Sequence, residues 1–98
     1  MKAERQILTF LIYIMMTSGA FSQDSHAADV IKTSAGDVEM YFIGHGSLMF
    51  KVNDYCIHID PVSSSGSYNN LPQADLILVT HEHYDHLDAA LISSLRKP

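Results

Sequence analysis

Histidine and aspartate crowd one short stretch of the chain, "THEHYDH", residues 80–86. His81, His83 and Asp85 stand two residues apart, and His86 follows directly. On an extended segment, side chains at i, i+2 and i+4 point to the same side, so these donor groups converge. Imidazole and carboxylate are ligands that zinc prefers. The spacing therefore predicts a metal site whose protein ligands are these four side chains.

The elements on either side of this motif would hold it in place. The continuous apolar run "ADLILVT", residues 74–80, predicts a strand buried on both faces. Leucines at a spacing of four predict an amphipathic helix over residues 86–96. Asp85 could cap that helix, but we expect it to bind metal and Asp88 to face the positive end of the helix dipole. The site would thus lie at the C-terminal end of a strand, where open sheets place their chemistry.

Three further strands are predicted upstream. Residues 37–44 alternate apolar side chains, and the runs 48–52 and 55–59 flank the turn signal Asn53-Asp54. These last two runs predict an antiparallel hairpin. Residues 63–73 form a Ser/Asn/Gly-rich stretch, which we interpret as a solvated connector, with a loop on the substrate side as the alternative.

The N-terminus has the layout of a secretory signal peptide. Positive charge precedes the apolar run 7–16, and small residues follow it. Cleavage would fall after Ala20, Ser22 or Ala27. The alternative is an uncleaved membrane anchor, although the run is shorter than the roughly 20 residues that cross a bilayer. We expect residues 1–22 to be removed and the mature protein to be periplasmic or secreted, with no membrane contact after cleavage.

Length and composition limit the remaining possibilities. The chain has 98 residues, a net charge of −5 and no basic run, which excludes a phosphate-tracking nucleic-acid surface. Cys56 is the single cysteine, so no internal disulfide can form, and we expect it to be a small buried strand residue. Residues 23–36 are polar and predict a flexible lead-in. Residues 37–98 would form one incomplete domain.

The motif and the segment before it resemble a known family. "THEHYDHLD" after an apolar strand looks like the H-x-H-x-D-H signature of the metallo-β-lactamase-fold hydrolases. "YFIGHGSLMFKVNDYCIHIDP", residues 41–61, resembles the branch that contains the L-ascorbate-6-phosphate lactonase-like and N-acylphosphatidylethanolamine phospholipase D-like proteins. The resemblance implies an α/β (α+β) fold, here the N-terminal half of a four-layer αββα sandwich.

The resemblance also implies roles for single residues. One or two zinc ions, or manganese or iron, would be bound: the first ion by His81 and His83, the second by Asp85 and His86. Asp85 would also act in catalysis by orienting a metal-activated water. Asp60 matches an aspartate that supports the metal ligands, although it could equally be a turn residue. His45 would face the active site or stabilise its turn.

The family's second half supplies further ligands that residues 1–98 do not contain. We therefore expect an exported metal-dependent hydrolase of an ester, lactone, amide or phosphodiester bond in a small-molecule substrate. It would be present here as a truncated, inactive portion that a complementing C-terminal half could complete. The alternatives are a small periplasmic metal-binding protein without catalysis and a remnant that does not fold.

Overall fold

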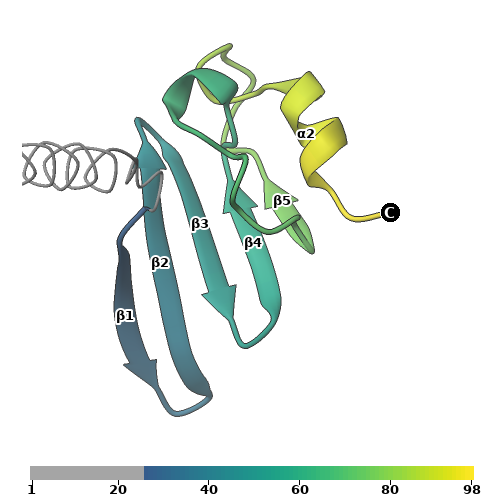
Figure 1. Ribbon diagram of the computed structural model, residues 1–98. Helices are drawn as coiled ribbons and strands as arrows, with labels where there is room; N and C mark the ends of the chain where they lie inside the picture. Colours follow the sequence, from purple (N-terminus) through teal and green to yellow (C-terminus); the bar gives the residue numbers. More distant parts are fainter. Residues whose placement is uncertain (1–25) are drawn as a thin grey trace, which may run out of the picture.

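The computed structural model describes residues 26–98 and contains one five-stranded sheet with a short helix beside it (Figure 1). The strands lie in the sheet in the order of the sequence: β1 (Ala28–Thr33), β2 (Gly36–Gly44), β3 (Ser47–Val52), β4 (Tyr55–Ile59) and β5 (Leu76–Leu78). β1 to β4 pair antiparallel, and β5 joins β4 in parallel. The predicted α+β class is confirmed. The predicted signal peptide, residues 1–22, lies outside the described residues.

β1 takes the place of much of the expected flexible lead-in, which corrects that prediction. Ala28–Thr33 pairs along its whole length with β2. The turn between the two strands closes at Gly36, whose φ of 119° is a left-handed conformation that favours glycine. Every residue of β1 is exposed, so no alternation of apolar and polar side chains marks it in the sequence.

The central strands agree closely with the prediction. β3 and β4 form the expected antiparallel hairpin, with Val52 opposite Tyr55. Asn53 has a φ of 53°, which the tight turn between these strands requires and which asparagine tolerates. Cys56 is buried, as expected.

The elements around the histidine motif are shorter than predicted. β5 covers only Leu76–Leu78, and two of its residues are exposed, so the prediction of a strand buried on both faces was wrong. α2 (Ala89–Leu95) begins three residues later than expected. Asp88 is its N-cap: the carboxylate accepts a hydrogen bond from the amide of Leu91 at 3.0 Å. No helix within residues 26–98 is long and apolar enough to cross a membrane.

One face of the sheet carries the core. Ile43, Met49 and Cys56 are buried there, and Tyr68 and Leu71 of the β4–β5 connector pack against them. The connector, which includes the 3-10 turn η1 (Ser63–Ser65), therefore covers the sheet, contrary to the solvated loop that was predicted. Its apolar side chains stand among serines and asparagines, so the sequence does not indicate that the connector packs on the core.

The opposite face is apolar and incompletely covered. Cross-strand partners stack there in three rows, none of whose side chains is buried: Val38–Val52–Tyr55, Met40–Phe50–Ile57–Leu76 and Phe42–Leu48–Ile59–Leu78. Phe42 is 55% exposed and Leu78 is 47% exposed. We call these rows the apolar face. The exposure of β5 follows from its position on this face.

Candidate metal centre

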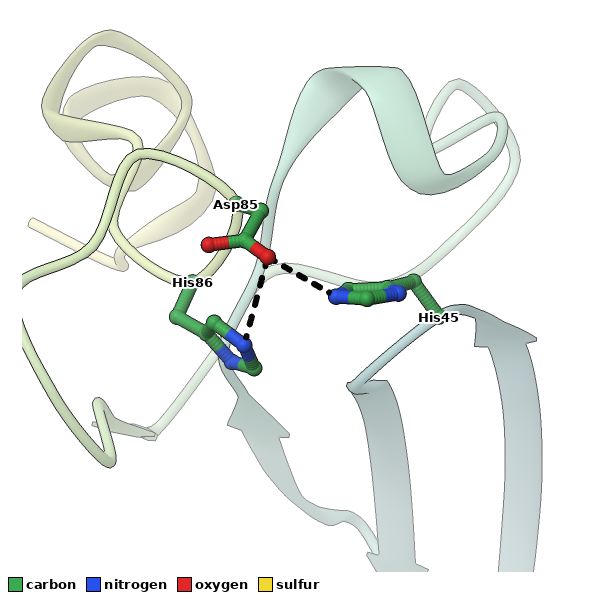
Figure 2. A group of neighbouring side chains, drawn as sticks. All are labelled: His45, Asp85 and His86. Carbon is green, nitrogen blue, oxygen red and sulfur yellow. Dashed lines mark hydrogen bonds and ion pairs between the residues drawn. The ribbon is translucent and has the colours of Figure 1, made fainter.

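Side chains from two separate segments of the chain meet beyond the strand ends. His45 comes from the β2–β3 turn, and His81, His83, Asp85 and His86 follow β5; we call these five residues the His–Asp cluster. His45 has a φ of 51° in the tight turn between the strands, and its ring contacts Asp85. Figure 2 shows His45 and His86 on either side of Asp85.

One group of three donors within residues 26–98 is close enough to share an ion. Ligand atoms of His45, Asp85 and His86 all lie within 4.8 Å of one another. Asp85 Oδ2 is 3.1 Å from His45 Nε2 and 3.7 Å from His86 Nε2 (Figure 2). Ligands of one zinc ion each lie about 2.0–2.2 Å from it, which is compatible with donors at these separations.

His81 and His83 lie against this group through their rings. The ring centroids of His81 and His86 are 3.9 Å apart, and those of His81 and His83 are 4.7 Å apart. The chain does not stay extended through the motif, as the spacing argument assumed. The amides of His86 and Leu87 both donate to the carbonyl of His83 at 2.9 Å, so the chain turns there and returns Asp85 and His86 toward the cluster.

Asp60 supports the cluster from beneath and is 2% exposed. Oδ1 accepts the amide of Thr80 at 2.6 Å, and Oδ2 accepts its hydroxyl at 2.6 Å and faces His86 Nδ1 at 2.8 Å. Burial favours the neutral acid, but the hydrogen bonds from Thr80 and His86 outweigh it and keep the pKa of this carboxyl below its usual range. An ionised carboxylate only accepts, so His86 Nδ1 carries a hydrogen; in the neutral ring the lone pair is then on Nε2.

Asp85 is held as a carboxylate by similar forces. Partial burial opposes its ionisation, but its own amide, His45 and the nearby His86 together lower its pKa. Because the carboxylate accepts, His45 Nε2 is the donor in their 3.1 Å contact. In this arrangement His45 orients Asp85. The predicted roles of the individual site residues stay predictions.

Gly46 leaves the space that His86 occupies. A Cβ atom at this position would lie 2.9 Å from His86 Cε1 and 3.2 Å from His86 Nδ1. The backbone of Gly46 is outside the left-handed region, so the ring, and not the backbone conformation, requires glycine here. Ser47 next to it donates from Oγ to the carbonyl of Asp60 at 2.6 Å, which ties the turn to the end of β4.

The cluster fits a zinc-type ion by its chemistry. It combines imidazole nitrogens with a carboxylate, and a buried second carboxylate fixes one of the imidazoles, as is usual around metal ligands. The ligand candidates and Asp60 could be identified in the sequence, but Gly46 and Thr80 could not. Thr80 stands directly before His81, but a threonine at a strand end gives no signal of its own, and Gly46 reads as an ordinary turn residue.

Known proteins resemble this chain in sequence and in fold. The profile of the Beta-lactamase superfamily domain matches residues 39–95. A protein of Sulfolobus acidocaldarius named as a metal-dependent hydrolase is 34% identical, over 54% of this chain and 26% of its own length. A crystal structure described as a metal-dependent hydrolase from Parabacteroides distasonis is 43% identical, with a TM-score of 0.69 over 74% of this chain and 34% of that one. This chain therefore spans about a quarter to a third of the relatives it matches. With more than half of its residues matched, the chain belongs to the Beta-lactamase superfamily domain family.

Proposed function

We propose that this chain supplies part of the active site of an exported, zinc-dependent hydrolase. One observation carries the proposal: Asp60 holds His86 by Nδ1, so that Nε2 faces the Asp85 carboxylate at the mouth of the cluster. A surface histidine without such support would be free to rotate. The names of the two relatives, both metal-dependent hydrolases, support the same activity.

The resemblance to the metallo-β-lactamase-fold hydrolases suggests the metal ligands, and the observed contacts suggest which residues support them. His81 and His83 would hold one metal ion, and Asp85 and His86 the other. The metal, when bound, supplies Lewis acidity and makes water nucleophilic near neutral pH. Asp60 keeps the tautomer of His86 fixed, and His45 keeps Asp85 oriented. Asp85, whose side chain is 38% exposed, would orient the metal-activated water.

The substrate would be a small molecule with an ester, lactone, amide or phosphodiester bond. The segment 41–61 supports the lactonase-like branch within the superfamily, and the apolar N-terminal run supports export to the periplasm or outside the cell. Manganese or iron in place of zinc would suit the same donors.

Completion of the site requires polypeptide from outside these 98 residues. Zinc in catalysis usually has three protein ligands per ion, whereas this proposal gives each ion two. The three rows of the apolar face contain no charged side chain, and a second sheet commonly covers a surface of this kind. We propose that the part of the fold corresponding to the unmatched two-thirds of the Parabacteroides structure packs on this face and brings the remaining ligands.

Calorimetric zinc titration, together with hydrolysis assays, tests the proposed activity and the proposed need for a second part. The chain alone should bind zinc weakly and hydrolyse nothing in a panel of nitrophenyl esters, lactones and phosphodiesters. Addition of the second part of the Parabacteroides protein should raise the affinity and produce hydrolysis. The Leu78→Lys variant places a charge on the apolar face, away from the metal-binding side chains. It should keep the weak zinc binding of the chain alone but show no gain in affinity or hydrolysis when the second part is added. Hydrolysis by the chain alone would contradict the need for completion.

Metal binding without catalysis is the second candidate, and the group of His45, Asp85 and His86 within one chain favours it. It predicts tight binding of a single zinc ion by the chain alone. It also predicts that the added second part changes neither affinity nor activity.

A further inference from the structure

We propose that Thr80 is a positioning residue that sets the tautomer of His81. Through Thr80, the single carboxylate of Asp60 would prepare two histidines, His81 and His86, to present Nε2. The inference rests on the proposed metal site and concerns how that site is preorganised.

The first step concerns the hydrogen bonds that Asp60 accepts. Its side chain is 2% exposed and receives the Thr80 amide on Oδ1 and the Thr80 hydroxyl and His86 Nδ1 on Oδ2. An ionised carboxylate has no hydrogen to give. The hydroxyl hydrogen of Thr80 must therefore point at Asp60. Turned away, it would leave two oxygen lone pairs facing each other at 2.6 Å.

The second step follows from the single hydrogen of a hydroxyl group. Thr80 Oγ1 also lies 2.8 Å from His81 Nδ1. With its hydrogen already given to Asp60, Oγ1 can only accept in this contact. His81 Nδ1 is therefore the donor and carries the ring proton, which leaves the lone pair of the neutral ring on Nε2.

The two steps together give one path of hydrogen bonds. His81 Nδ1 donates to Thr80 Oγ1, Thr80 donates to Asp60 Oδ2, and His86 Nδ1 donates to the same oxygen. The two rings have centroids 3.9 Å apart. Each ring presents Nε2 as its metal-binding atom, so the ligands are prepared before any metal arrives. Support of this kind is typically worth about 10–100-fold in metal affinity.

Nitrogen-15 NMR of the metal-free, full 98-residue chain tests the inference directly. His81 and His86 should both show the Nδ1–H tautomer at pH 8. The wild-type spectrum is decisive without any variant, because the Nε2–H tautomer at His81 in the folded chain would overturn the inference.

Two substitutions of Thr80 separate the hydroxyl from the shape of the side chain. Thr80→Val should release His81 into mixed tautomers, leave His86 in its Nδ1–H form and lower zinc affinity about tenfold. Thr80→Ser should restore both the tautomer and the affinity. An unchanged His81 spectrum in Thr80→Val, or a folded Thr80→Ser chain with the Val spectrum, would refute the role of the hydroxyl.

The NMR readout uses neither metal nor substrate. Correct tautomers in a chain that never supports hydrolysis would count against the proposed function alone. Wrong tautomers in a hydrolase would count against the role of Thr80 alone.

Discussion

Asp60 Oδ2 and His86 Nδ1 lie 2.8 Å apart, although 26 positions separate these residues in the sequence. The contact joins the end of β4 to the turn before α2. Asp60 is almost wholly buried, whereas the His86 side chain is 17% exposed. A buried carboxylate thus holds a histidine near the surface. Because Asp60 lies at the end of β4, the orientation of His86 depends on the position of that strand.

Replacement of Asp60 by Asn should weaken metal binding. The amide has one acceptor oxygen for three donors, so His86 or Thr80 loses its partner. We expect zinc affinity to fall about 10–100-fold and the free energy of unfolding to fall by about 1–3 kcal/mol. Calorimetric titration and urea denaturation measure the two effects. Unchanged affinity in a folded Asp60→Asn chain would rule out Asp60 as a support for the ligands.

Addition of a methyl group at Gly46 should displace the ring of His86. The new Cβ atom would lie 2.9 Å from Cε1, closer than such atoms approach, so the ring must move away from Asp60. Zinc affinity in Gly46→Ala should fall about tenfold, in the range found for lost ligand support. Gly36→Ala, at the other end of β2, strains a turn instead and should lower stability without altering zinc affinity. Equal zinc affinity in both variants would show that Gly46 has no role in placing His86.

His58 should make the fold sensitive to mild acid. It is fully buried, Nε2 contacts the carbonyl of Pro72 at 3.0 Å, and Nδ1 has no hydrogen-bond partner within residues 26–98. Burial lowers the pKa of His58, against a smaller opposing effect of the Pro72 carbonyl. The unfolded chain therefore binds this proton more readily. Stability is complete above the unfolded pKa of about 6.5 and decreases as the pH falls below it.

Urea denaturation of the His58→Gln chain between pH 7.5 and 5 provides the measurement. Glutamine keeps a donor for Pro72 but does not titrate, so the loss of stability over this range should be smaller than in the wild type. An identical pH dependence in the two proteins would show that His58 is not responsible.

Asp88 should stabilise both α2 and the connector that covers the core. Its carboxylate caps the helix through Leu91 and also accepts the amide and hydroxyl of Ser63 at 3.0 and 2.7 Å. Asp88→Ala should lower the free energy of unfolding by about 1–2 kcal/mol, the upper part of the range for lost caps. Asp29→Ala on the exposed strand β1 is the control and should stay within about 0.5 kcal/mol of the wild type. Thermal denaturation followed by circular dichroism compares them; equal midpoints would contradict the double role of Asp88.

The central hairpin could be predicted from the sequence because each of its signals is local. The apolar runs of β3 and β4 and the turn at Asn53 lie within a dozen residues. β1 could not be predicted in this way, because both of its faces are exposed and nothing selects its side chains. The burial of β5 was overestimated, because Leu76 and Leu78 lie on the apolar face and not in the described core.

The candidate site was predictable in composition but not in geometry. The spacing in "HEHYDH" identified the donors, yet a turn at His83, and not an extended strand, brings Asp85 and His86 back. The contacts of Asp60 with Thr80 and His86 span 20 and 26 positions. No periodicity connects residues at such separations, so the network beneath the cluster is visible only in the fold.

The order of the strands bears on the folding kinetics. β1 to β4 form a meander in which each strand pairs with its neighbour in the sequence, so only short loops need to close. The parallel pairing of β4 with β5 closes the much longer connector, and the cluster gathers only after that step. We therefore expect the β1–β4 meander to form early and the metal-binding side chains of the His–Asp cluster to come together last. A metal ion bound by groups that assemble so late would slow unfolding while leaving the folding rate almost unchanged.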